Sequence, residues 1–208
     1  MKTQPTNKKT WGIYSSLAQE TKFEDLPEYL QNCAKEYNIK HDTSEGMQQI
    51  LYLGNLGLFI NYIANIQFII VKRNIETKTG KEITEDELYE LISNINPTLI
   101  DKISSYSIDI LTTEDISKIY EDFSVLLQMY KKNKIFCVDS GKLKSIINQI
   151  QKHNFKTFAN KNSCINNIKT LKKLNDLGLQ KYISKQMTRI LGETINQEIN
   201  EEFPNKYR

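Results

Sequence analysis

Hydrophobic residues recur three or four positions apart through most of the chain, and strict alternation of apolar and polar residues is almost absent. This spacing is typical of amphipathic helices and argues against a sheet. For example, it predicts a helix that buries Leu88, Leu91, Ile92 and Ile95. A short strand is allowed only at residues 134–138, with the sequence KIFCV. The fold class predicted from the pattern is therefore all-α.

Residues that start or stop helices divide this pattern into about seven helices. The predicted starts are Asp25 with Pro27 in the first turn, Thr84 with Glu87 as a capping box, Thr113, and Asp139 or Ser140. The predicted stops are Pro97, Gly178 and Gly192. We expect one compact helical bundle spanning residues 1–208, with residues 1–10 flexible.

The longest uncharged run, 26 residues between Glu45 and Lys72, predicts the central helix of the bundle (residues 45–72). Its length would also suffice to cross a bilayer, and burial by oligomerisation is a third interpretation. However, it contains the amides of Asn55, Asn61, Asn65 and Gln67. Amides in hydrocarbon are costly without partners, so we favour a core helix and expect no stable membrane insertion.

Helical spacing places Gly54, Gly57, Asn61 and Asn65 on one stripe of this helix. Small residues in such a stripe allow a neighbouring backbone to approach closely. We interpret Asn61 and Asn65 as a buried amide pair with satisfied hydrogen bonds, and not as site residues.

The composition is that of a globular protein. Hydrophobic residues make up 39% and charged residues 25%, with only 8 Gly and 4 Pro, which excludes collagen-like and largely disordered chains. Three widely spaced cysteines, Cys33, Cys137 and Cys164, favour unpaired thiols over disulfides or a zinc site. The polar first ten residues lack the apolar core of a secretory signal. We therefore expect a cytoplasmic protein.

The charges are unevenly distributed along the chain. An acidic part, residues 76–130, holds 4 basic and 12 acidic side chains, a net charge of −8. A basic part, residues 131–189, holds 14 basic and 2 acidic side chains, a net charge of +12. Such asymmetry favours a polyanionic partner for the basic part.

We expect the basic side chains to form one lysine-rich face that binds RNA or DNA phosphates. The candidate residues are Lys142, Lys144, Lys152, Lys156, Lys169, Lys172, Lys173, Lys181, Lys185 and Arg189. Phe155 and Phe158 would stack on unpaired bases if they were exposed. The alternative is that both phenylalanines belong to the core. Because arginine is scarce, backbone or shape recognition is expected over base-specific reading.

The charge pattern allows two other interpretations. The acidic and basic parts could pack together and screen each other within one molecule. Alternatively, the chain could be a helical adaptor or inhibitor that binds another protein through its acidic part or its apolar helix. The helices around Gly178 fit a helix-turn-helix poorly, because Leu174 and Ser184 stand where that motif requires a small and a buried residue.

Catalytic chemistry has little support in the sequence. The chain has only two histidines, His41 and His153, and neither has the neighbours that a metal site or nucleophile would need. Gly141 and Lys142 could hold one phosphate at a helix start, without a complete phosphate-loop motif. We therefore expect no cofactor, no metal and no catalytic residues. The leading hypothesis is a non-enzymatic nucleic-acid-binding protein, and a role as a subunit of a nucleoprotein assembly fits it.

Overall fold

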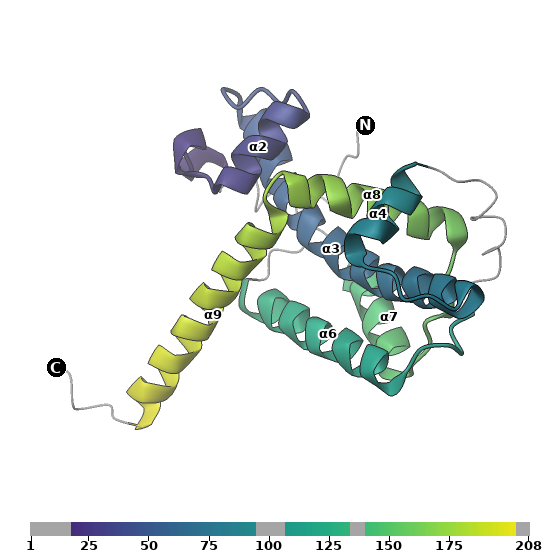
Figure 1. The fold of residues 1–208 in the computed structure, drawn as a ribbon. Coiled ribbons are helices and arrows are strands. Elements are labelled where there is room, and N and C mark those ends of the chain that lie inside the picture. Colours follow the sequence, from purple (N-terminus) through teal and green to yellow (C-terminus); the bar gives the residue numbers. More distant parts are fainter. Residues whose placement is uncertain (1–17, 95–106, 134–139, 203–208) are drawn as a thin grey trace.

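The computed structural model describes residues 18–94, 107–133 and 140–202, and within these ranges the chain is helical, without a strand (Figure 1). The elements are η1 (Phe23–Asp25), α2 (Glu28–Glu36), α3 (Ser44–Thr79), α4 (Glu85–Ser93), α6 (Thr113–Asn133), α7 (Ser140–Gln151), η2 (Lys156–Phe158), α8 (Lys161–Asp176) and α9 (Leu179–Glu202). The all-α prediction is confirmed. The expected flexible start (residues 1–10) and the whole of the expected short strand (residues 134–138) lie outside the described residues.

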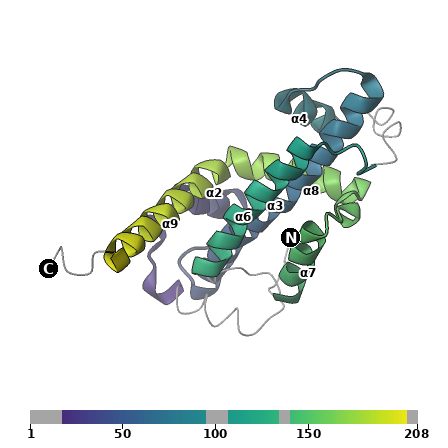
Figure 2. The same cartoon turned by 90° about the horizontal axis from the view of Figure 1, so that it is seen from below.

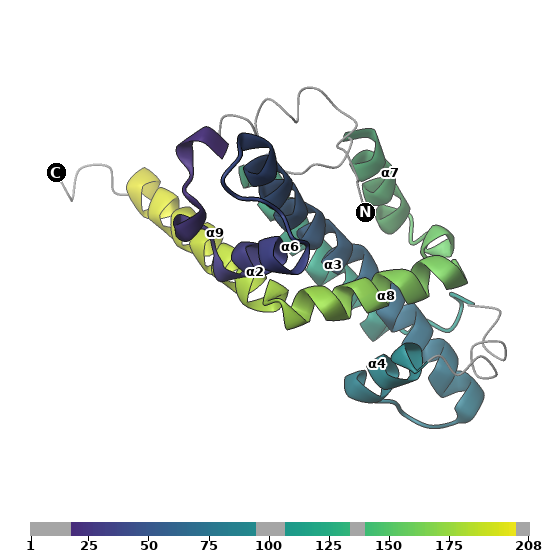
Figure 3. The ribbon, with the colours of Figure 1, turned by 90° about the horizontal axis from the view of Figure 1, so that it is seen from above.

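The long apolar segment forms α3, a helix of 36 residues, which corresponds to a length of about 54 Å. α2, α6, α8 and α9 all pack against it. Seen from below and from above, α6 lies on one side of α3 while α2 and α8 lie on the other (Figures 2 and 3). The hydrophobic segment therefore packs against four of the other described α-helices.

The described α3 extends beyond the predicted end at Lys72. Its C-cap is Gly80, in the left-handed region at φ 68°. The amide N–H of Gly80 donates to the carbonyl of Glu76. Charged residues continue a helix as long as its backbone hydrogen bonds can form, so the helix ends where the glycine permits a left-handed turn.

α3 is the one helix in the described ranges that is long and apolar enough to cross a bilayer, by length and composition alone. Its most apolar 18-residue window is 53% buried inside the molecule. Ile50, Ala64 and Ile70 are each 0% exposed, since neighbouring helices cover them. This burial is the behaviour expected of a core helix in a folded protein.

The polar groups of α3 find partners on α8 and α9. Gln67 is only 2% exposed; its Oε1 accepts from Asn167 Nδ2 at 2.8 Å, and its Nε2 donates to Ser163 Oγ at 3.3 Å. Asn61 Oδ1 accepts from Gln180 Nε2 at 3.2 Å. Asn61 and Asn65 are both half-buried, so the expected buried amide pair is wrong. Among the described side chains of this helix, the buried amides are instead Gln67 and Asn74, which are 2% and 3% exposed.

The apolar side chains gather in two clusters that share α3 and α8. The larger cluster brings together α2, the first two thirds of α3, α6, η2 and α9. The smaller cluster lies at the C-terminal end of α3, where α4 and the start of α8 meet, and consists of Phe68, Val71, Ile75, Leu88, Ile92, Cys164 and Ile168. α3 and α8 therefore connect all the other helices into one structure.

The predicted helix starts have different outcomes. Thr84 and Glu87 form the expected capping box: Glu87 N–H donates to Thr84 Oγ1, and Thr84 N–H donates to Glu87 Oε2 at 2.8 Å. The prediction for Asp25 is wrong, because Asp25 belongs to η1 and Pro27 is the N-cap of α2. The extended backbone of Pro27, with ψ 143°, separates the two helices.

The remaining ends follow the same local rules, with one exception. α6 begins at Thr113, as predicted, after Thr112 accepts a hydrogen bond from the Asp115 N–H. α7 begins at Ser140, and the other candidate start, Asp139, lies outside the described residues, as does Pro97. Gly178, with φ 101°, separates α8 from α9, whereas Gly192 lies inside α9. The predicted stop at Gly192 is therefore wrong.

Candidate nucleic-acid interface

α7, η2 and most of α8 come from a segment without any carboxylate side chain. From Ser140 to Asn175 the chain has no Asp or Glu, and it carries eight lysines: Lys142, Lys144, Lys152, Lys156, Lys161, Lys169, Lys172 and Lys173. α7 and η2 therefore have no acidic side chain of their own, and the only one on α8 is its last residue, Asp176. Other neutralisation of their charge must come from other helices.

The solvent face of α7 carries lysines and amides together. Lys144, Asn148, Gln151 and Lys152 have the spacing i, i+4, i+7, i+8, which places them on one side of a helix, and all four are exposed. The opposite side ends at Ile150, which is 0% exposed. Burial of that apolar side therefore determines which residues of α7 face the solvent.

Hydrogen bonds hold the backbone of the turn between α7 and η2 in place. Tyr120 Oη on α6 donates to the Ile150 carbonyl at 3.0 Å, and the N–H of Asn154 donates to the Gln149 carbonyl at 2.7 Å. Between them His153 has φ 52°, and its ring contacts Tyr120 edge-on. These contacts terminate α7 and position the exposed Lys152 and Lys156 on either side of the turn.

Phe155 and Phe158 are core residues. They are 2% and 4% exposed and belong to the larger hydrophobic cluster. The expectation that they stack on bases is wrong, because both rings would have to leave the core to reach a ligand. The alternative that they pack inward is confirmed. The turn between α7 and α8 needs apolar side chains to hold it against α3, and these two residues provide them.

Three of the ten predicted interface residues form ion pairs within the chain. The Nζ atoms of Lys172, Lys173 and Lys181 lie 3.3, 2.6 and 3.0 Å from carboxylate oxygens of Asp176, Glu36 and Glu28, respectively. The hydrogen bond from Lys181 lowers the pKa of Glu28. The hydrogen bond to Glu36 raises the pKa of Lys173, whose Nζ also lies 5.1 Å from the centre of the Tyr37 ring.

Lys173 and Lys181 therefore connect α8 and α9 to α2. Glu28 and Glu36 lie two helical turns apart on α2. No local pattern predicts that α2 lies beside these lysines. Lys185, one turn after Lys181, also contributes to lowering the pKa of Glu28. Lys181 and Lys185 of α9 thus both have Glu28 of α2 as an acidic neighbour.

The other predicted interface residues lie on different helices and differ in exposure. Lys144, Lys152 and Lys156 on α7 and η2 are exposed, and Lys169 on α8 is half-buried; none of these four forms an ion pair with the described residues. Arg189 is exposed on α9. The side chain of Lys142 lies outside what the structure describes, so the phosphate site expected at Gly141 and Lys142 does too. α7 and α9 lie at different sides of the molecule (Figures 2 and 3).

The acidic part, residues 76–130, neutralises little of this charge. α4 packs against α8 through Leu88 and Ile92, in the smaller cluster. Among the described residues, however, no ion pair joins α4 to α8. The ion pairs of this part of the chain do not support the alternative that the acidic part screens the basic part, because the carboxylates that pair with Lys173 and Lys181 belong to α2. Among the basic residues whose side chains the structure describes, the exposed lysines of α7 and η2 (Lys144, Lys152 and Lys156) form no ion pair, and neither does the half-buried Lys169 of α8.

Catalytic or metal chemistry finds no further support in the described ranges. No group of three His, Cys, Asp or Glu side chains there could hold a metal ion. Cys33 and Cys164 are free thiols, and burial raises their pKa to about 11 and about 12. His41 stacks on Phe23 with ring centres 3.9 Å apart. Cys137 lies outside the described residues.

Comparison with known proteins adds no assignment. No protein-family model matches this chain, and searches of curated proteins and of solved structures give no match.

Proposed function

We propose that the protein binds RNA or DNA, without catalysis, through a surface formed by Lys144, Asn148, Gln151, Lys152 and Lys156, here called the α7–η2 surface. The observation that carries the proposal is the exposure of three lysines on elements that contain no carboxylate. This surface is narrower than the ten-residue face expected from the sequence, since Lys172, Lys173 and Lys181 pair within the chain.

The chemistry of this surface suits a nucleic-acid backbone. Each lysine that contacts a phosphate releases condensed counterions, which favours binding at low salt. The exposed amides of Asn148 and Gln151 lie between the lysines and can donate to phosphate or sugar oxygens or to base edges. No arginine is present from Ser140 to Asn175. The proposed recognition therefore follows the backbone more than the base sequence.

The salt dependence of binding tests the proposal directly. Fluorescence-anisotropy titrations would use labelled single- and double-stranded oligonucleotides at 50 and 200 mM salt. With three lysine–phosphate contacts, the affinity for duplex should fall by about fortyfold between these concentrations. Absence of binding at 50 mM salt to either oligonucleotide would overturn the proposal.

A charge-reversal variant tests the location. The triple variant Lys144→Glu, Lys152→Glu, Lys156→Glu should lose most of the affinity, and its salt slope should fall by about 3. The matched control is Lys22→Glu, Lys35→Glu, Lys40→Glu, which changes the net charge equally at three exposed lysines near α2. Equal losses in the two variants would mean that net charge alone drives binding, and would contradict the assignment to the α7–η2 surface.

A further inference from the structure

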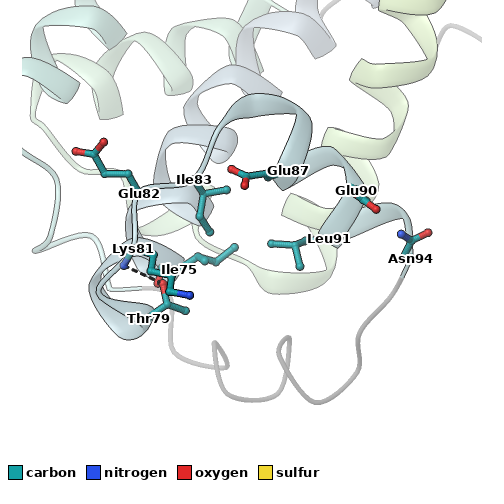
Figure 4. A pocket seen from close by; sticks show the side chains of 9 residues that line it. All are labelled: Ile75, Thr79, Lys81, Glu82, Ile83, Glu87, Glu90, Leu91 and Asn94. Atoms are coloured by element: carbon teal, nitrogen blue, oxygen red, sulfur yellow. Dashed lines mark hydrogen bonds between the residues drawn. The ribbon is translucent and has the colours of Figure 1, made fainter.

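A pocket of about 520 Å³ opens between the end of α3, the following turn and α4 (Figure 4). Its apolar lining comes from Ile75, Ile83 and Leu91, its acidic lining from Glu82, Glu87 and Glu90, and its one basic lining residue is Lys81. Ile75 is buried, Ile83 and Leu91 are half-buried, and the three glutamates are exposed. The pocket thus combines an apolar floor with an acidic rim.

The walls of this pocket are held by hydrogen bonds within the chain. Gly80 ends α3 with φ 68°. Glu76 Oε1 accepts from the N–H of Ile83 at 3.1 Å, which fixes the turn against α3. The capping box of Thr84 and Glu87 then fixes the first turn of α4. A ligand would therefore meet a preformed surface and need not order it.

The two flanks of α4 have different roles. Leu88 and Ile92 are 0% and 4% exposed and pack into the smaller cluster. Leu91 was expected to join them, but it is half-buried and lines the pocket. Glu87 and Glu90 line the same pocket. An apolar side chain surrounded by carboxylates is therefore available to a partner.

The charge around the pocket selects that partner. Residues 81–94 contain five carboxylates and one lysine. Glu82 and Glu90 form no ion pair with the described residues, whereas Glu87 is held by its capping hydrogen bonds. A nucleic acid or an anionic lipid surface would be repelled here. A ligand that carries both cationic and aliphatic groups would be attracted by the rim and buried on the floor.

We propose that this pocket docks a basic, amphipathic segment of a partner protein. An aliphatic side chain of the segment inserts between Ile83 and Leu91, and its lysine or arginine side chains pair with Glu82 and Glu90. This site is separate from the α7–η2 surface and opposite in charge. The protein would then connect a nucleic acid to a basic protein, and either interaction can be tested without the other.

Methyl NMR of the full chain tests the pocket with defined peptides. The probe is a twelve-residue helical peptide of lysines and leucines, and the comparison peptides replace either lysine by glutamate or leucine by glycine. The lysine–leucine peptide should shift the methyl resonances of Ile83 and Leu91 but not that of Ile147 on α7. Absence of these shifts, or equal shifts from the lysine–glycine peptide, would overturn the proposal, because the pocket would then contribute nothing beyond charge.

Two double variants distinguish the effect of the rim glutamates on peptide binding from the effect of the protein's net charge. Glu82→Lys with Glu90→Lys should weaken the peptide by at least tenfold. The matched control, Glu24→Lys with Glu121→Lys, reverses two exposed carboxylates elsewhere and should leave the affinity within twofold. Equal effects would contradict the pocket. Oligonucleotide affinity, measured on the same variants, should not decrease, so failure here and failure of the proposed function are distinguishable.

Discussion

At Gly57 the close contact between α2 and α3 depends on a missing side chain. A Cβ at this position would overlap with the hydroxyl of Tyr29. Tyr29 is 2% exposed and packs against Tyr182, so its ring has little room to move. We predict that Gly57→Ala lowers the free energy of unfolding by about 1–3 kcal/mol. Steric overlap should outweigh the gain of about 1 kcal/mol that alanine normally brings to a helix.

Two further variants test this explanation in urea unfolding experiments. In a Tyr29→Phe background, Gly57→Ala should lower the free energy of unfolding by much less than it does in the original protein, because the overlapping hydroxyl oxygen is absent. Gly192→Ala places the same methyl group in open space within α9, and should raise stability by about 0.5–1 kcal/mol. A Gly57→Ala protein as stable as the original would show that the contact is loose.

The ion pair between Arg73 and Asp115 joins α3 to the start of α6. Arg73 Nε donates to Asp115 Oδ2 at 2.8 Å, and Nη2 donates to Oδ1 at 3.2 Å. Burial acts to raise the pKa of Asp115, but hydrogen bonds from Arg73 and Thr112 lower it below its usual value. The ion pair therefore contributes its full stabilisation when the pH is above the pKa of Asp115 in the unfolded chain, about 4. This stabilisation is lost as the pH falls through the lower pKa of Asp115 in the folded protein.

Replacing one partner should expose this dependence. Arg73→Met leaves the carboxylate of Asp115, a residue 8% exposed, without its cation. We predict a loss of about 2–3 kcal/mol at pH 7, somewhat below the cost of breaking a fully buried pair. The loss should shrink as the pH is lowered through the folded pKa of Asp115, and Arg73→Met with Asp115→Asn should be more stable than Arg73→Met alone. A pH-independent loss in thermal melts would refute the role of the charge.

A contact between two residues could be predicted from the sequence only where the partners lie close together along the chain. The capping box of Thr84 and Glu87 was predictable because both residues belong to one helical turn. The contact of Tyr29 with Gly57 and the pair of Arg73 with Asp115 require knowledge of which helices are neighbours. The glycine stripe indicated a close approach but could not identify the ring that fills it.

Among the elements, sequence signals located the helices better than their ends. Gly178 and Gly192 have the same chemistry, yet only Gly178 adopts a positive φ. The next residue, Leu179, is 0% exposed, so the change of direction at Gly178 allows α9 to begin inside the core. Local propensity cannot distinguish the two glycines, because tertiary packing determines whether the chain must turn.

The attachment of α2 to α8 gives a prediction at this scale. Lys173 Nζ lies 2.6 Å from Glu36 Oε1, and both side chains are nearly half exposed. Lys173→Glu should therefore lower stability by no more than about 1 kcal/mol. Combining it with Glu36→Lys restores opposite charges and should recover most of the loss in denaturant titrations. Because this lysine pairs within the chain, the charge-swapped protein should bind oligonucleotide as tightly as the original. A large decrease in oligonucleotide affinity would show that Lys173 belongs to the nucleic-acid interface.

Across the whole molecule, the sequence correctly indicated a basic segment but not how its charge is distributed in space. The lysine-rich stretch was visible in the order of residues. The partial neutralisation of these lysines by Glu28 and Glu36 could not be seen in the sequence, since α2 precedes α8 by more than a hundred residues. The polar stripe of α7 had a local signal, the spacing of Lys144, Asn148, Gln151 and Lys152. The pocket beside α4 depends on the turn at Gly80 and had no such signal.

The arrangement of the two hydrophobic clusters predicts cooperative unfolding as one unit. α3 contributes Ile66 to the larger cluster and Val71 to the smaller one, and α8 contributes Leu171 and Ile168 in the same way. Neither cluster can lose its packing without disturbing a helix that the other requires. Pulse alkylation in urea can test this, because Cys33 lies in the larger cluster and Cys164 in the smaller one.

Both thiols are at most 1% exposed, and burial raises their pKa to about 11 for Cys33 and about 12 for Cys164. At pH 8 their thiolate fraction should be lower than that of an unfolded cysteine by roughly a hundredfold or more. In a Cys137→Ser background, we predict that both thiols become reactive at the same urea concentration, coincident with the loss of helical circular dichroism. Reaction of Cys164 at clearly lower urea would mean that α4 and the end of α3 open separately, as a less stable unit. The docking pocket would then lie on a structure that exchanges between closed and open forms, and its affinity for a basic peptide would fall with the closed fraction.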